Sequence, residues 1–173
     1  IVKYIRNLVI RLIISFFLVL FGTEFFHFIL YKPTFYLSYL MLLPYKPRLL
    51  DYAIGIGETR LVFVPACVAA SAYVLLSLLI LLTKDIGLRR GINLFVTGFL
   101  AILTVNLLRI LFLALILIEL NVGLFETLHL FFWQVLSTAF VISLWIWLTK
   151  HYKIKNIPVY SDFVYLEKNI HKL

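Results

Sequence analysis

The sequence predicts an all-α membrane protein, a bundle of about four transmembrane helices with a small extracytoplasmic β-hairpin or re-entrant segment between the first helix and the second. The composition, the lengths of the apolar runs and the placement of the charges predict it. Of the 173 residues, 64% are hydrophobic, and the mean hydropathy is +1.06. Soluble domains are only about half apolar, so a soluble globular domain is excluded. The single cysteine also excludes an internal disulfide and a metal cluster built on cysteines.

Four apolar stretches are each long enough to cross a bilayer, which takes about 20 residues. They are residues 9–31, 64–82, 92–118 and 124–148, within a single domain of residues 1–173. The first stretch is long and has no small-residue cleavage site, so we expect no cleavable signal peptide. Residues 149–173 are polar, basic and aromatic, and we expect a cytoplasmic tail along the membrane surface.

The outer link, residues 32–63, differs from the other connections. Its first part contains Pro33, Pro44 and Pro47, which makes it too interrupted for a span, so we expect an interfacial or re-entrant segment there. Its second part alternates apolar residues with glycine around Gly57 and indicates a β-hairpin. The alternative is that these residues extend the second helix.

Lysine and arginine set the predicted orientation, because cytoplasmic loops are enriched in them. They concentrate in the N-terminal segment, in the link that contains Arg89 and Arg90, and in the tail. Both termini are therefore expected in the cytoplasm of a multi-pass plasma membrane protein. Because the charges lie at the ends of apolar runs, we assign the net charge of +8 to contacts with membrane lipids and expect no nucleic acid partner.

Three reactive or charged side chains fall in one layer of the predicted bundle. With a rise of about 1.5 Å per residue, Cys67, Arg109 and His129 each lie about 5–15 Å from the outer end of a different helix. Charged and titratable residues inside spans are costly and indicate function. Cys67 follows Pro65 at a predicted helix start, where free N–H groups favour a thiolate; the alternative is a small packing residue.

Three further polar residues are candidates for supporting roles. Asn106 precedes Arg109 by three residues, so both lie on one helix face, and Glu126 stands in the same relation to His129. Glu126 is either the carboxylate that orients the imidazole or an acid favoured by the helix dipole. Glu24, at similar depth in the first span, is either a partner of Arg109 or an interfacial residue.

The segments VPACVAASAY, NLLRI and ETLHLFF, on successive predicted spans, resemble the exosortase/archaeosortase family of membrane cysteine transpeptidases over about residues 60–150. The resemblance implies that Cys67 is the nucleophile, Arg109 the transition-state stabiliser and His129 the acid/base, with no cofactor and no metal. It also implies substrates that are secreted proteins with a C-terminal motif, a hydrophobic span and a basic cluster. Many members have Ser-Gly or Thr-Gly after the cysteine where this chain has Val68 and Ala69, and many are longer.

The function hypothesis is therefore an enzyme, a thiol protease and transpeptidase active near the outer face. It would cleave the C-terminal sorting signal through a Cys67 thioester, which a lipid amine, another amine or water then resolves. The alternative is a non-enzymatic protein, a small transporter subunit or membrane assembly scaffold in which Arg109 forms a buried pair with a carboxylate.

Overall fold

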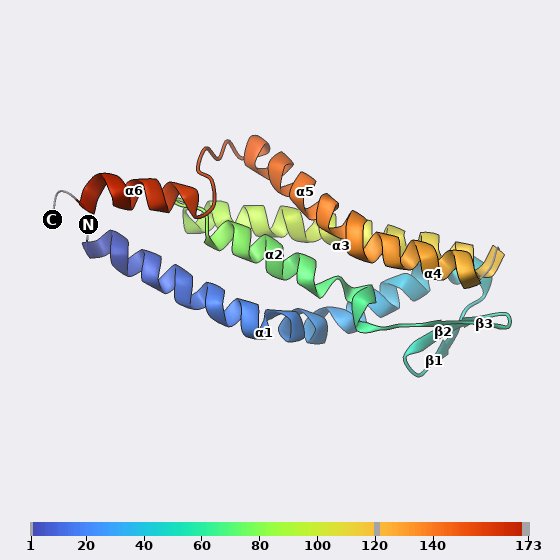
Figure 1. Cartoon of the computed structure of the whole chain (residues 1–173). Helices are drawn as coiled ribbons and strands as arrows, with labels where there is room; N and C mark the ends of the chain where they lie inside the picture. Colours follow the sequence, from blue (N-terminus) through green and yellow to red (C-terminus); the bar gives the residue numbers. More distant parts are fainter. Residues whose placement is uncertain (1, 120–121, 171–173) are drawn as a thin grey trace.

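Helices aligned along one long axis make up most of the chain, with a small sheet at one end (Figure 1). The computed structural model describes residues 2–119 and 122–170. The helices are α1 (Val2–Met41), α2 (Ala70–Leu81), α3 (Leu88–Glu119), α4 (Val122–Phe131), α5 (Ser137–His151) and α6 (Tyr160–Ile170). The largely helical class predicted from composition is thus confirmed.

Two helices, α1 and α3, are long and apolar enough to cross a membrane. In the most apolar 18-residue window of α1, only 11% is buried inside the protein. Large apolar side chains of α1 such as Phe16, Phe17 and Phe28 are exposed instead. Exposed apolar surface on this scale is typical of a helix that faces lipid or a partner.

The first helix is longer than the predicted stretch of residues 9–31. It continues through Pro33 to Met41, and the short 3-10 helix η1 (Leu43–Tyr45) follows it. Proline inside a helix removes one hydrogen bond and crowds the preceding turn. Thr34, Phe35 and Ser38 beyond it are buried, so packing holds this part helical. The chain is therefore not re-entrant over residues 33–41.

The second apolar stretch is divided into two helices. The 3-10 helix η2 (Pro65–Val68) comes first, and Ala69 then turns the backbone before α2 begins at Ala70. At 1.5 Å per residue, the 12 residues of α2 are about 18 Å long. The fourth stretch, in contrast, is one helical run in which the π-helical turn η3 (Phe132–Leu136) joins α4 to α5.

The sheet has three antiparallel strands in the order β1 (Arg48–Leu50), β2 (Ala53–Ile56) and β3 (Thr59–Val62). The predicted hairpin corresponds to β2 and β3, with Ile56 opposite Thr59 and a turn at Gly57. Gly57 has a φ of +59°, a left-handed conformation that glycine adopts without steric cost. Strand β1 was not expected. All of β2 is buried, with Ile54 and Ile56 close to α3.

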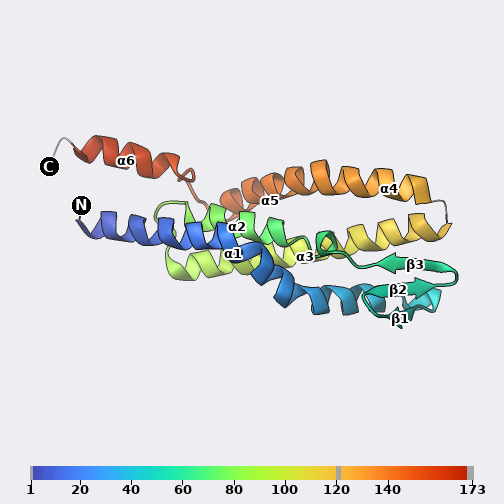
Figure 2. The same cartoon turned by 60° about the horizontal axis from the view of Figure 1, so that its bottom comes forward.

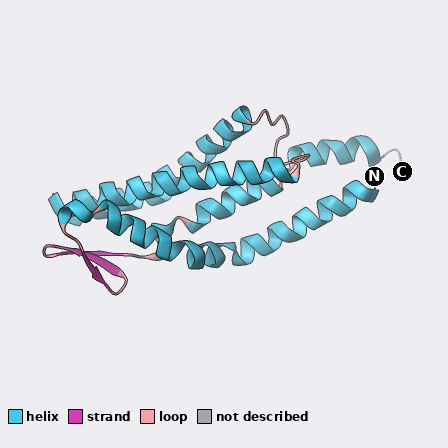
Figure 3. Cartoon of the chain, turned by 180° about the vertical axis from the view of Figure 1, so that it is seen from behind, coloured by secondary structure: helices cyan, strands magenta, loops and turns pink. Residues whose placement is uncertain are grey.

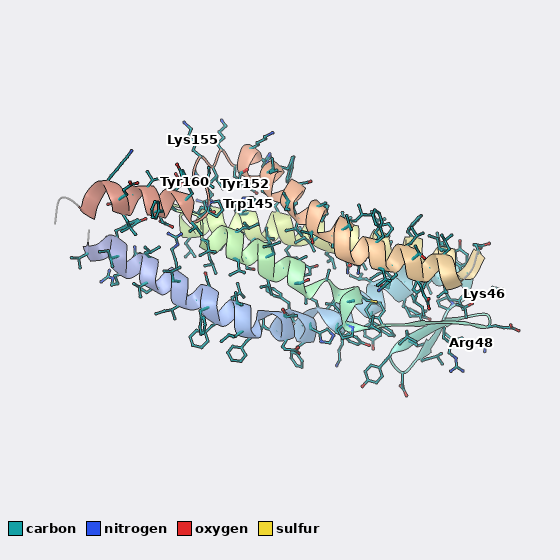
Figure 4. All side chains as sticks on the ribbon, viewed as in Figure 1. Lys46, Arg48, Trp145, Tyr152, Lys155 and Tyr160 are labelled. Atoms are coloured by element: carbon teal, nitrogen blue, oxygen red, sulfur yellow. The ribbon has the colours of Figure 1, made fainter. Side chains whose placement is uncertain are left out.

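The two ends of the molecule differ in character. The start of α1 lies beside α6 at one end, and the sheet lies at the opposite end, as two further views show (Figures 2 and 3). Asp162 of α6 is buried and forms a 2.9 Å ion pair with Arg11 of α1, and it also accepts a hydrogen bond from the Tyr4 hydroxyl. Figure 4 places Lys46 and Arg48 at the sheet end, and Lys155 and Tyr160 toward α6.

Candidate active site

A cavity of about 570 Å³ lies between strand β3 and helices α3 and α4. The predicted catalytic residues Cys67, Arg109 and His129 all line it. They come from three separate segments, η2, α3 and α4. The rest of the lining is Glu58, Thr59, Arg60, Leu61, Val62, Val64, Ile110, Leu113, Leu117, Phe125 and Glu126. The three side chains that helix lengths placed at similar depth therefore line the same cavity in the fold.

Cys67 lies in the short η2 turn, with only 8% of its surface exposed. Its backbone is held on both sides: its N–H donates to the Val64 carbonyl at 2.9 Å, and its carbonyl accepts from Asn106 Nδ2 at 2.7 Å. The side chain predicted to brace Arg109 therefore braces the cysteine backbone. A helix does begin at Pro65, as predicted, but it is the short 3-10 helix η2, and the α-helix α2 begins only at Ala70.

Ala69 explains why α2 does not extend back to Pro65. Its φ of 56° and ψ of 33° are left-handed, a conformation that costs a residue with a Cβ about 1–2 kcal/mol. The strained residue is two positions after Cys67, and a glycine would adopt this conformation without steric cost. The backbone at this position thus favours the glycine that this chain lacks.

Arg109 is buried in α3, with 8% of its surface exposed. Its Nη2 donates to the Ala66 carbonyl at 2.9 Å, and its Nη1 lies 3.5 Å from Ser137 Oγ. Its Nε is buried without a hydrogen-bond partner. Buried donors are rarely left unsatisfied, so this guanidinium retains capacity for an acceptor on a ligand.

The imidazole of His129 is half-buried on α4 and packs against Phe125, with ring centroids 5.6 Å apart. Glu126, also on α4, lines the same cavity but is exposed. Within residues 2–119 and 122–170, no hydrogen bond joins His129 to Cys67 or to Glu126. The structure therefore brings the predicted base and its predicted orienting carboxylate to the cavity without linking them.

Glu24 is the predicted supporting residue that the fold leaves apart. It is exposed on α1 and does not line the cavity. The ion pairs formed by the described residues are Arg11 with Asp162 and Lys84 with Asp85. Neither Glu24 nor another described carboxylate is paired with Arg109.

Ser137 and the wall formed by β3 were missed by the sequence reasoning. Ser137 donates to the Phe132 carbonyl at 2.8 Å and so spans the π-helical turn next to Arg109. The sequence gives little indication of a role for Ser137, since it is one of several hydroxyl residues within a long apolar run. The contribution of β3 depends on how the link folds back over α3, which no local pattern specifies.

Two more cavities meet at Arg109. One, of about 520 Å³, lies between α3 and α5 and has a mostly apolar lining that includes Ile102, Phe112 and Phe140. The other, of about 380 Å³, is lined by small residues around Ala66 and by Thr23 of α1. Arg109 therefore lies where the cavity beside the sheet, which Cys67 and His129 also line, meets the apolar space among the helices.

Comparison with models of protein families, with curated proteins and with solved structures finds no match for this chain. In the part of the chain that the structure describes, no three His, Cys, Asp or Glu side chains are close enough together to hold a metal ion.

Proposed function

We propose that this chain is a membrane-embedded cysteine transpeptidase that cleaves the C-terminal sorting signal of secreted surface proteins through a thioester on Cys67. The observation that carries the proposal is that Cys67, Arg109 and His129 line one cavity although they come from three separate segments. Acyl transfer requires a nucleophile, a base and a group that stabilises the oxyanion. The thiol, the imidazole and the guanidinium in this cavity can supply them.

The proposed setting is a plasma membrane crossed four times, with both termini in the cytoplasm and the sheet at the outer face. The spans are α1, η2 with α2, α3, and the continuous run from α4 to α5. The exposed apolar surface of α1 supports this, because the core helix of a soluble protein would be buried. The start of α1 and helix α6 at the same end (Figure 1) fit an even number of crossings.

The reaction begins with transfer of the Cys67 thiol proton to His129. The sulfur attacks the carbonyl carbon of the scissile peptide, a C–S bond forms, and Arg109 stabilises the developing oxyanion. When the C–N bond breaks, the His129 proton passes to the leaving amine, which departs with the C-terminal segment. An amine or water then attacks the thioester, loses its proton to His129, and releases Cys67, which regains that proton as a thiol.

Arg109 suits this role because its charge is fixed in position. The Ala66 carbonyl and Ser137 hold its Nη atoms, so little reorganisation is needed when charge develops nearby. The apolar cavity of about 520 Å³ on α3 and α5 suits a hydrocarbon chain, either from the hydrophobic span of the substrate or from a lipid acceptor.

The same contacts argue against the scaffold alternative. That model needs a carboxylate to neutralise Arg109 inside the membrane. The described residues supply a carbonyl and a hydroxyl instead, and Glu24 is exposed. A guanidinium without a carboxylate partner among the described residues suits a site that binds a negatively charged intermediate.

The test compares the native protein with Cys67→Ala in cells that produce it, by mass spectrometry of the C-termini of surface proteins. Secreted proteins that end in a hydrophobic span and a basic cluster should lose that segment only with the native protein. Ser77→Ala is the matched control, because the Ser77 hydroxyl donates to the Tyr73 carbonyl within α2 and Ser77 does not line the cavity that holds Cys67. If the Cys67→Ala protein is folded and the cells that produce it still cleave these secreted proteins, the proposal is contradicted.

A further inference from the structure

The free edge of β3 carries backbone groups that no other part of the described chain uses. The Phe63 N–H donates to the Tyr52 carbonyl at 2.8 Å, and the register places Ile54 opposite Leu61 and Ile56 opposite Thr59. In an antiparallel pair, hydrogen-bonded and non-hydrogen-bonded positions alternate. The N–H and C=O groups of Arg60 and Val62 therefore point away from β2.

The active-site cavity runs along this edge. Successive residues of a strand project to opposite faces of a sheet, yet all four residues of β3, from Thr59 to Val62, line the cavity. A cavity below one face would meet only alternate residues, so this one borders the strand edge. Of the three strands, β3 lies nearest α4 (Figure 2).

The edge also leads directly to the nucleophile. From Val62 the chain passes through Phe63 and Val64 into the turn that holds Cys67, and Val64 and Cys67 line the same cavity. A peptide that pairs with β3 and runs in the same direction therefore brings its C-terminal end to Cys67.

We propose that β3 binds the substrate by strand addition, holding the residues before the scissile bond as an extended strand parallel to β3. This inference rests on the proposed function and specifies how its substrate is recognised. Main-chain hydrogen bonds to Arg60 and Val62 supply sequence-independent binding. An extended, flexible segment is then the substrate form that the site accepts, and a helical segment is excluded.

The probe is a short biotinylated alanine peptide ending in a chloromethyl ketone, which alkylates a thiol by displacing chloride. Its matched form carries N-methyl groups on the internal amides and cannot donate hydrogen bonds. Cys67 is the single cysteine, so labelling reports this site, and Cys67→Ala is the blank. We expect the unmethylated peptide to label the purified full-length protein about tenfold faster, the effect of two backbone hydrogen bonds.

Two proline variants locate the interaction. Val62→Pro removes an outward N–H from β3 and should slow labelling by the peptide about threefold, the effect of one hydrogen bond. Leu49→Pro is the control, since Leu49 holds the outward position on β1, the other edge. Proline is tolerated where the N–H faces away from the sheet. Iodoacetamide is too small to pair with β3, so it should label Cys67 in both variants at the native rate.

The outcomes separate this inference from the proposed function. Equal labelling by the two peptides while iodoacetamide reacts readily overturns strand addition and leaves the thiol chemistry intact. Equal slowing by Val62→Pro and Leu49→Pro also overturns it. If Val62→Pro changes the iodoacetamide rate, the comparison of the two peptides on the native protein decides. A folded protein in which neither reagent labels Cys67 contradicts the proposed function and this inference together.

Discussion

Replacing Arg109 separates a catalytic cation from a structural one. The guanidinium donates to the Ala66 carbonyl at 2.9 Å and approaches Ser137 at 3.5 Å. A hydrogen bond from a charged group contributes about 1.5–3 kcal/mol, so Arg109→Ala should lower the free energy of unfolding by about that amount. If Arg109 also stabilises the oxyanion, turnover should fall by a factor of about 10²–10³. Arg109→Lys keeps the charge without the planar fork and should retain intermediate turnover.

The assay pairs two measurements on the same detergent-solubilised samples: thermal unfolding, and release of the C-terminal segment from a membrane substrate. Arg48→Ala is the control, because Arg48 is an exposed arginine at the sheet end that does not line the cavity (Figure 4). It should leave both quantities unchanged. A folded Arg109→Ala protein with native turnover would refute the role assigned here. Arg109→Lys with native stability but with turnover as low as that of Arg109→Ala would show that charge alone does not stabilise the transition state.

Four further changes test other parts of the account. His129→Ala should abolish turnover without unfolding the protein, whereas His151→Ala, at the end of α5 against Trp147, should have no effect; equal activity of the two variants excludes His129 as the base. Ala69→Gly should raise stability by about 1 kcal/mol by relieving the left-handed backbone, measured as the unfolding temperature, and a lower temperature would show that Ala69 is not strained. Asp162→Ala should cost about 1.5–3 kcal/mol and release α6 from Arg11 and Tyr4, so that protease cleaves near residue 157 first; an unchanged cleavage rate would mean that the ion pair does not hold α6. Reporter fusions at Gly87 and Gly123 should lie on opposite sides of the membrane, with Gly123 outside, and the same side for both would end the proposed topology.

The sequence predicted which three side chains lie near one another better than it predicted the helix boundaries. Helix geometry alone placed Cys67, Arg109 and His129 in one layer, because depth in a span depends only on residue count and rise. All three line one cavity. Their partners were harder to predict, since rotation about each helix axis depends on packing. Asn106 therefore holds the cysteine carbonyl instead of Arg109, and Glu24 is exposed.

The differences in the fold have equally local causes. Pro33 predicted a helix end, but the buried side chains of Thr34, Phe35 and Ser38 stabilise the helix beyond it. The unbroken apolar run after Pro65 gave no sign of the turn at Ala69, because alanine normally favours helix. Strand β1 is only three residues long and fully exposed, so it has no alternating pattern that sequence analysis can detect.

The central claim is that Cys67 forms a thioester with a cleaved protein. The most direct measurement is mass analysis, intact and after digestion to peptides, of the protein isolated from membranes that contain its substrate. It is made before and after treatment with hydroxylamine, which cleaves thioesters. The account predicts an added mass on the peptide that contains Cys67, lost on treatment and never present in Cys67→Ala. Active processing with no adduct on Cys67, or with an adduct that persists in Cys67→Ala, would contradict it.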